Sequence, residues 1–181
     1  MAERQVALLR GINVGRAKRV AMADLRALVA ELGYGEVRTL LNSGNVVYTA
    51  PGIAPDDAAE RIEAAIRARL GITSRVTALT AADVAAAVAG NPLGEVADNP
   101  SRLFVAVLRD PADRARLEPL AERDWGREVL ALGERVAYLW CPDGSMGSQL
   151  PEAVSRALGD AVTTRNWATL TKLNALAGGT G

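Results

Sequence analysis

Two successive rounds of the same secondary-structure signals constrain the fold of this chain more than any other feature. In residues 5–79, apolar runs and helical spacings follow one another in the order strand, helix, strand, strand, helix, strand. The same order returns in residues 102–163. This order is typical of the split βαβ, or ferredoxin-like, unit. We therefore predict an α+β fold of two tandem ferredoxin-like (α/β-plait) units, with a connecting helix and a C-terminal helix.

Signals at the element ends set the predicted boundaries. Thr80 to Asp83 resembles a capped helix start, and the following helix should end at Gly90-Asn91-Pro92. The predicted domains are residues 1–80, a connecting helix and linker at 81–101, and residues 102–181. The predicted strands are 5–10, 37–41, 46–49, 75–79, 102–108, 128–132, 135–140 and 161–163, and the predicted helices begin near 22, 55, 80, 111, 148 and 166.

Composition excludes several classes of protein. Of 181 residues, 49% are hydrophobic and 23% are charged, which favours a folded globular chain over a disordered one. The formal net charge is zero, which argues against non-specific wrapping of nucleic acid. No apolar run approaches a membrane span or a signal-peptide core, so we predict a cytoplasmic protein that does not enter a membrane.

The chain contains no histidine, which removes the commonest general base and the commonest metal ligand. Cys141 is the single cysteine, and we expect a buried, inert thiol. The acidic residues form no obvious convergent pair. We predict no metal and no cofactor, and the sequence identifies no nucleophile or base, so catalysis is left open.

Two polar segments should meet at one end of the first sheet. Residues 10–19 follow the first strand and carry Arg10, Asn13, Lys18 and Arg19. Residues 42–45 join the second and third strands. In a ferredoxin-like unit the first two strands run parallel, so these two loops lie at the same end. The predicted ligand-binding residues of these segments are Arg10, Asn13, Lys18, Arg19, Ser43 and Asn45.

The glycines and cationic residues at this end of the sheet indicate an anionic ligand. Gly11 and Gly15 allow close approach of the backbone, and a helix start follows. The alternative is structural: residues 10–19 are a solvated basic loop, and residues 42–45 are an ordinary hairpin turn.

A third polar segment, residues 163–169, joins the last strand to the C-terminal helix. Thr163 or Thr164 could cap that helix. The predicted ligand contacts are Arg165, Asn166, Trp167 and Lys172. The structural alternative is a capped helix anchored by a core tryptophan. Whether this segment joins the first two depends on domain packing.

These motifs together resemble a bacterial family known as domain of unknown function 1697. The resemblance rests on Arg10–Gly15 leading to Met22 and Leu25, on Ser43–Val47, and on Thr164–Trp167 with Thr169 and Lys172-Leu173, and it extends along the whole chain. It implies two ferredoxin-like domains and no activity, because the family is uncharacterised. Gln149 stands where the family pattern has a lysine.

Three functional hypotheses follow. The first is a site for a phosphorylated or otherwise anionic small molecule. The second is a nucleic-acid-binding module that uses the same basic residues, with Phe104, Tyr138 and Trp140 as base-stacking side chains. The third is a structural or protein-interaction module in which the motifs fix domain packing. The oligomeric state is left open.

Overall fold

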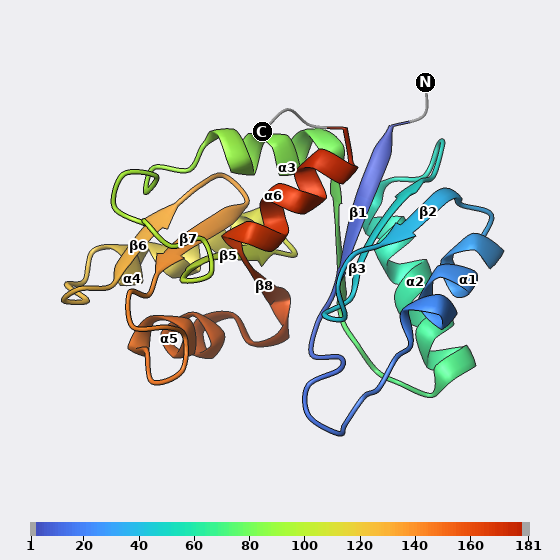
Figure 1. Cartoon of the computed structure of the whole chain (residues 1–181), viewed down its shortest axis with the longest axis horizontal. Helices are drawn as coiled ribbons and strands as arrows, with labels where there is room; N and C mark the ends of the chain where they lie inside the picture. Colours follow the sequence, from blue (N-terminus) through green and yellow to red (C-terminus); the bar gives the residue numbers. More distant parts are fainter. Residues whose placement is uncertain (1–2, 179–181) are drawn as a thin grey trace. The chain divides into compact units, whose positions relative to one another are not determined.

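A computed structural model describes residues 3–178 of the chain (Figure 1). These residues divide into two compact units, one made of residues 3–84 and 173–178 and the other of residues 85–172. Each unit contains one four-stranded antiparallel sheet. In the described part of the chain, no helix has the length and apolar character needed to cross a membrane.

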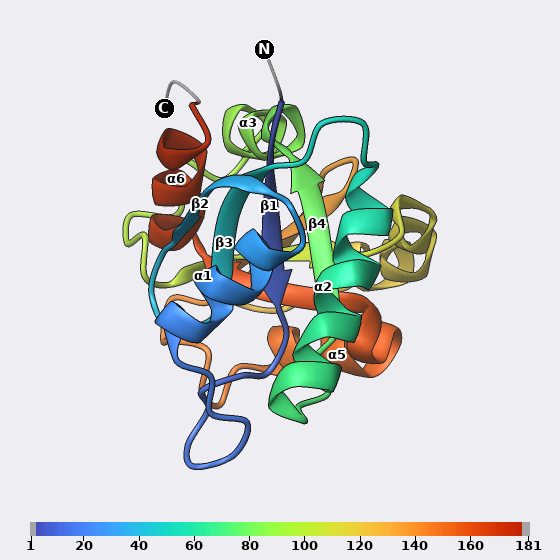
Figure 2. The ribbon, with the colours of Figure 1, turned by 90° about the vertical axis from the view of Figure 1, so that its right-hand side faces the viewer.

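The first unit is a βαββαβ fold, as predicted. Its sheet has the order β2-β3-β1-β4 with antiparallel neighbours, and α1 and α2 cover one face (Figure 2). The core under these helices joins Ala7, Leu9 and Tyr48 of the sheet to Leu25 and Ile62 of the helices. The elements are β1 (Arg4–Leu9), α1 (Met22–Glu31), β2 (Gly35–Thr39), β3 (Asn45–Thr49), α2 (Pro55–Leu70) and β4 (Val76–Thr80).

Local sequence signals explain where these helices begin and end. Pro55 opens α2, whose first turn contains acidic side chains, and Gly71 ends it with a φ of 65° that favours glycine. Helix α3 (Ala81–Ala89) begins with a reciprocal cap. The Thr80 amide donates to Asp83 Oδ2 and the Asp83 amide donates to Thr80 Oγ1, both at 3.0 Å.

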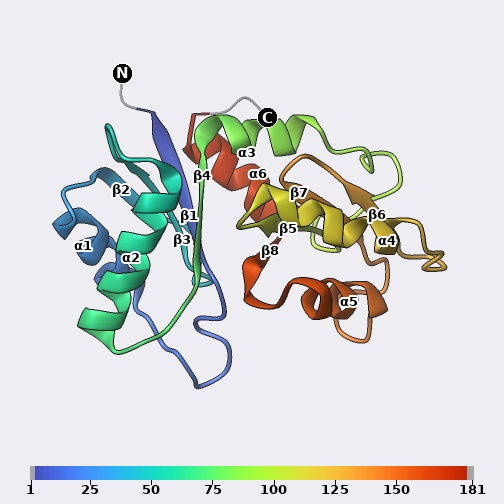
Figure 3. The same ribbon diagram turned by 180° about the vertical axis from the view of Figure 1, so that it is seen from behind.

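The second unit repeats the topology with the strand order β6-β7-β5-β8, and Figure 3 shows it from behind. Its helix-side core includes Ala106, Leu139, Cys141, Leu150 and Val154. The elements are β5 (Leu103–Leu108), the 3₁₀ helix η1 (Pro111–Leu117), α4 (Glu118–Ala121), β6 (Val129–Leu132), β7 (Val136–Trp140), α5 (Gln149–Leu158), the 3₁₀ turn η2 (Gly159–Ala161) and β8 (Val162–Asn166). The C-terminal helix α6 (Trp167–Leu176) begins in the second unit, and its residues from Leu173 onward are counted with the first.

Two predicted elements of the second unit differ in the structure. The helix expected at 111–124 is a 3₁₀ helix followed by a single α-turn, because Pro119 has no N–H to continue an α-helical ladder. The last strand extends to Asn166 instead of ending at Thr163. Its polar residues pair with β5 from Phe104 to Leu108, and this pairing holds them in extended backbone.

Candidate functional site

The loop after β1 and the turn between β2 and β3 meet, as the topology predicts. The Leu9 amide donates to the Gly44 carbonyl at 2.9 Å. Further along, Asn13 Nδ2 donates to the Asn42 carbonyl at 2.8 Å. The first two polar segments of the sequence therefore form one continuous surface at one end of the first sheet.

Asn13 fixes the basic loop by three hydrogen bonds, which we call the Asn13 clamp. Its Nδ2 donates to the carbonyls of Val20 and Asn42, and its Oδ1 accepts from the Val20 amide, all at 2.8 Å. The residue has a φ of 54°, a left-handed conformation that asparagine tolerates better than most residues. Within the clamp, Val14 and Ala17 form an antiparallel bridge, so the loop folds back on itself as a narrow finger.

The turn at residues 42–45 is also held from inside. Asn45 is fully buried, and its Nδ2 donates to the Leu40 carbonyl at 2.7 Å and to Ser43 Oγ at 2.8 Å. A Cβ on Gly44 would lie 2.8 Å from Leu9 Cβ and from Ile12 Cδ1, and its φ is 89°. Only glycine fits there. Asn13 and Asn45 therefore shape this surface, while the Ser43 side chain is exposed on it.

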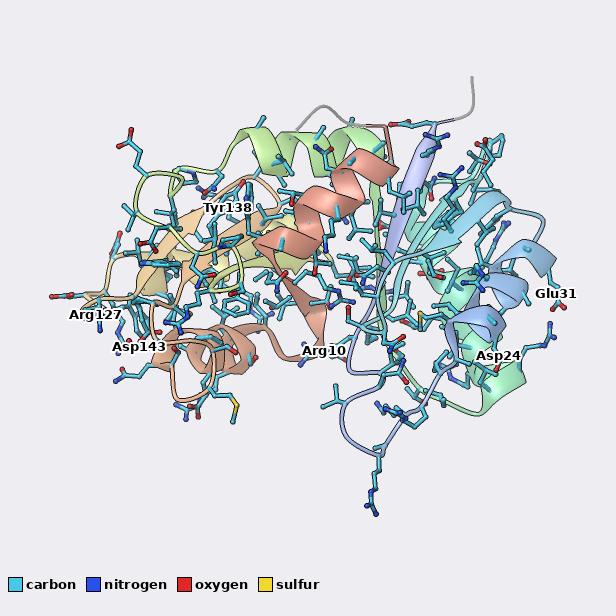
Figure 4. All side chains as sticks on the ribbon, in the orientation of Figure 1. Arg10, Asp24, Glu31, Arg127, Tyr138 and Asp143 are labelled. Carbon is cyan, nitrogen blue, oxygen red and sulfur yellow. The ribbon has the colours of Figure 1, made fainter. Side chains whose placement is uncertain are left out.

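Most of the cationic side chains of the loop are exposed to solvent. Arg16, Lys18 and Arg19 are exposed, and Arg19 Nη1 donates to the Gly15 carbonyl at 3.2 Å. Lys18 has a φ of 50°. Arg10 is half-buried where β1 ends and the loop begins (Figure 4). Exposed guanidinium and ammonium groups on an ordered loop can bind an oxyanion through charge-assisted hydrogen bonds.

A cavity of about 490 Å³ lies beside this loop, at the start of α1. The cavity size is within the usual range for small-molecule sites. Arg19 provides a positive charge and Asp24 a negative one, and α1 has no side-chain cap at its N-terminus. The cavity is lined by Asn13, Arg19, Val20, Ala21, Met22, Asp24 and Asn42. Sequence reasoning did not select Asp24, although it is the first acidic residue after the basic loop.

The third polar segment belongs to the second unit and has its own internal contacts. Arg165 is 8% exposed, and its Nη1 donates to Thr163 Oγ1 and to the Thr164 carbonyl, both at 3.0 Å. Burial lowers the pKa of Arg165 to about 10. The expectation that a threonine caps the last helix is wrong, because Asn166 Oδ1 accepts from the Thr169 amide at 2.9 Å.

Two further predicted residues of this segment lie on α6. Trp167 is half-buried at the helix start, and Lys172 is exposed. Ligand binding by the third segment, and its joining to the first two, stay predictions.

The aromatic stacking surface proposed for nucleic acid is wrong. Phe104 pairs with Leu139 and packs on the helix-side core, whereas Tyr138 pairs with Val105 on the opposite face of the sheet. Tyr138 is buried, and its hydroxyl donates to the Ala87 carbonyl at 2.6 Å. Burial raises the pKa of Tyr138. Phe104 and Tyr138 pack on opposite faces of the sheet, so the three aromatic side chains cannot form one open platform for bases.

Across residues 3–178, no cluster of three or more Cys, Asp or Glu side chains is placed to hold a metal ion. Cys141 is buried as predicted, and burial raises the pKa of its thiol to about 11. A thiol with this pKa is a poor nucleophile near neutral pH.

Comparisons with known proteins agree with this architecture. A family profile described as "Protein of unknown function (DUF1697)" matches residues 2–138. The chain therefore belongs to this family. The matched range ends before the third polar segment, so it does not reach Arg165 or Lys172.

One solved structure shows the same fold over the full length. The conserved bacterial protein SP0830 from Streptococcus pneumoniae superposes with a TM-score of 0.75 at 22% identity, covering 98% of this chain and 99% of that chain. At this identity the likeness concerns the fold alone. No curated protein matches the sequence.

Proposed function

We propose that the first unit binds a small molecule that carries a phosphate or a similar oxyanion, at the surface formed by residues 10–19 and 42–45. The cavity of about 490 Å³ with Arg19 in its wall carries this proposal. The Asn13 clamp supports the proposal, because it orders the loop before a ligand binds. Less conformational entropy is then lost when the cations of the loop contact the ligand.

The opposite charges of the cavity narrow the ligand class. The Arg19 guanidinium can bind an oxyanion, and the Asp24 carboxylate can accept hydrogen bonds from hydroxyl groups. A phosphorylated polyol, such as a sugar phosphate, offers both groups on one molecule. Lys18 and the Ser43 hydroxyl, both exposed on the loop and the turn, are proposed as further hydrogen-bond donors to this ligand. Arg10, which lies where β1 meets the loop, is a proposed contact of the same ligand.

A calorimetric titration with ribose 5-phosphate tests this proposal. We expect Arg19→Gln to weaken binding by about tenfold, since a charge-assisted hydrogen bond is worth about 1.5–3 kcal/mol. Arg26→Gln is the matched control, because Arg26 lies on α1, outside the cavity wall, and donates to Thr39 Oγ1. Equal affinity of wild type and Arg19→Gln would contradict the site, and ribose binding as tightly as ribose 5-phosphate would contradict the anion.

One observation favours a second candidate, the binding of single-stranded nucleic acid. Arg16 and Lys18 are exposed on the loop but do not line the cavity, so they can reach a ligand larger than the cavity. Three loop cations that each neutralise a phosphate predict a log–log salt slope of about −2 for a single strand. Arg16→Gln should then reduce the slope by about 0.7, and it should leave the affinity for ribose 5-phosphate unchanged.

A further inference from the structure

The second unit contains a separate cavity that neither its sequence motifs nor the proposed function accounts for. It has a volume of about 490 Å³ and is lined by Val96, Asp98, Asn99, Arg102, Arg127, Trp140 and Pro142. All of these residues belong to residues 85–172. They come from the linker after α3, from the segment before β6 and from the end of β7, so the cavity is built by tertiary folding and not by one local motif.

Two arginines converge in this cavity. Arg102 Nη1 donates to the Pro142 carbonyl, and Arg127 Nη1 lies 3.1 Å from Asp143 Oδ2 and 3.2 Å from Asp143 Oδ1. Figure 4 shows Arg127 and Asp143 beside each other. Because Pro142 and Asp143 are consecutive, the two guanidinium groups are held at neighbouring points of one loop although they are 25 positions apart in the sequence.

The backbone that carries Arg102 is ordered by hydrogen bonds. The Arg102 amide donates to the Asn99 carbonyl at 3.0 Å, and the Arg102 carbonyl accepts from the Cys141 amide at 3.0 Å. Asn99 Oδ1 accepts from the amide of Ser101 at 3.0 Å and from its hydroxyl at 2.6 Å. Arg102 is thus presented by a tight turn that is joined to the end of β7.

An anionic ligand can displace the Asp143 carboxylate from Arg127. Both side chains are 75% exposed, and exposed ion pairs are weak. An incoming oxyanion could replace the Asp143 carboxylate on Arg127 and bridge to Arg102. Two guanidinium groups around one oxyanion is the arrangement that favours phosphate or carboxylate recognition.

The remaining walls favour a flat apolar group on the same ligand. Trp140 is 6% exposed at the cavity, and Val96 and Pro142 add apolar surface. Asp98 is exposed and offers a hydrogen-bond acceptor. A ring that bears N–H or hydroxyl groups could lie against these side chains while its oxyanion reaches the arginines.

We propose that the second unit binds an oxyanion attached to a flat ring, the chemistry of a nucleoside monophosphate, through Arg102 and Arg127. The site is independent of the one in the first unit, and either could exist without the other. No reaction is assigned to it.

Titration of the full chain with adenosine 5′-monophosphate, followed by two-dimensional NMR, tests the proposal. We expect Arg127→Gln to weaken binding at least tenfold, with amide shifts around Arg102 and Trp140 in the wild type. Arg127 is exposed, so its replacement should leave the fold intact. Arg123→Gln is the matched control, because Arg123 stacks over Trp125 at 4.3 Å and does not line the cavity.

Four results would overturn the proposal. The first is unchanged affinity in Arg127→Gln and in Arg102→Gln. The second is adenosine 5′-monophosphate binding that is abolished by Arg19→Gln and unaffected by Arg127→Gln, which would place this ligand in the first unit. The third is equal binding of adenosine and its monophosphate, which would remove the oxyanion from the recognition. The fourth is that ribose 5-phosphate shifts the amides around Arg102 and Trp140 at the same concentrations as adenosine 5′-monophosphate, which would refute the contact with the ring.

Discussion

Replacing Asn13 by alanine should release the basic loop while the rest of the first unit stays folded. The side chain makes three hydrogen bonds of 2.8 Å, two with the backbone of Val20 and one with the Asn42 carbonyl. At ~1 kcal/mol net each, their loss costs ~3 kcal/mol. Alanine at a φ of 54° adds ~1 kcal/mol, because a Cβ disfavours the left-handed region. Water can replace part of these bonds at a half-exposed residue, so we expect at least ~2 kcal/mol.

Hydrogen exchange at the Val20 amide measures this cost directly. A destabilisation of ~2 kcal/mol corresponds to about 30-fold faster exchange. Asn42→Ala is the control, because Asn42 contributes its backbone carbonyl to the clamp and the substitution leaves that group in place. Asn13→Asp should give a smaller increase in exchange than Asn13→Ala, since a carboxylate can still accept from the Val20 amide but cannot donate to the two carbonyls. Exchange at Val20 within threefold of wild type in Asn13→Ala would refute the clamp.

Three other experiments test the packing inside each unit. Gly44→Ala should destabilise the first unit by ~2 kcal/mol or more in urea unfolding, because the new Cβ would lie 2.8 Å from other atoms. Gly52→Ala is the control: its Cβ would have no atom within 4 Å, so only the positive φ should cost stability, ~1 kcal/mol. Tyr138→Phe should cost ~1 kcal/mol, because it leaves the buried Ala87 carbonyl without its donor, and an unchanged urea midpoint would contradict that hydrogen bond. Burial keeps the Cys141 thiol neutral, so its contribution to folding stability should be full below the pKa of the unfolded-state thiol and should fall as the pH rises toward about 11. Iodoacetamide should then alkylate Cys141 only as fast as the chain unfolds, and rapid alkylation of the native chain at pH 8 would disprove this burial.

The order of elements could be predicted because it depends on local signals. Pro55 and Gly71 bound α2 through backbone preferences that the residues carry with them. The meeting of the first two polar segments could also be predicted, because it follows from strand directions alone. Pro119 is a local signal against a long helix after β5, and the prediction of a helix beginning near 111 did not use it.

The hydrogen-bonding and binding roles of individual polar residues could not be predicted in the same way. The Asn13 clamp joins residues that are 29 positions apart, and nothing in either segment alone specifies the bond. Strand β8 was predicted too short because its polar residues resemble a loop, and pairing with β5 overrides that preference. Arg102 and Arg127 were indistinguishable from the many other arginines until folding placed them in one cavity wall.

Burial divides the first two motifs into a frame and a binding surface, and the division has a measurable consequence. Asn13 and Asn45 hold backbone carbonyls, so changing either should lower stability and ligand affinity together. Lys18 and Arg19 are exposed, so changing either should lower affinity and leave stability nearly unchanged. If Lys18→Gln and Arg19→Gln instead destabilised the chain as much as Asn13→Ala does, the cations would belong to the frame. The resemblance between family members at this loop would then reflect folding and not a shared ligand.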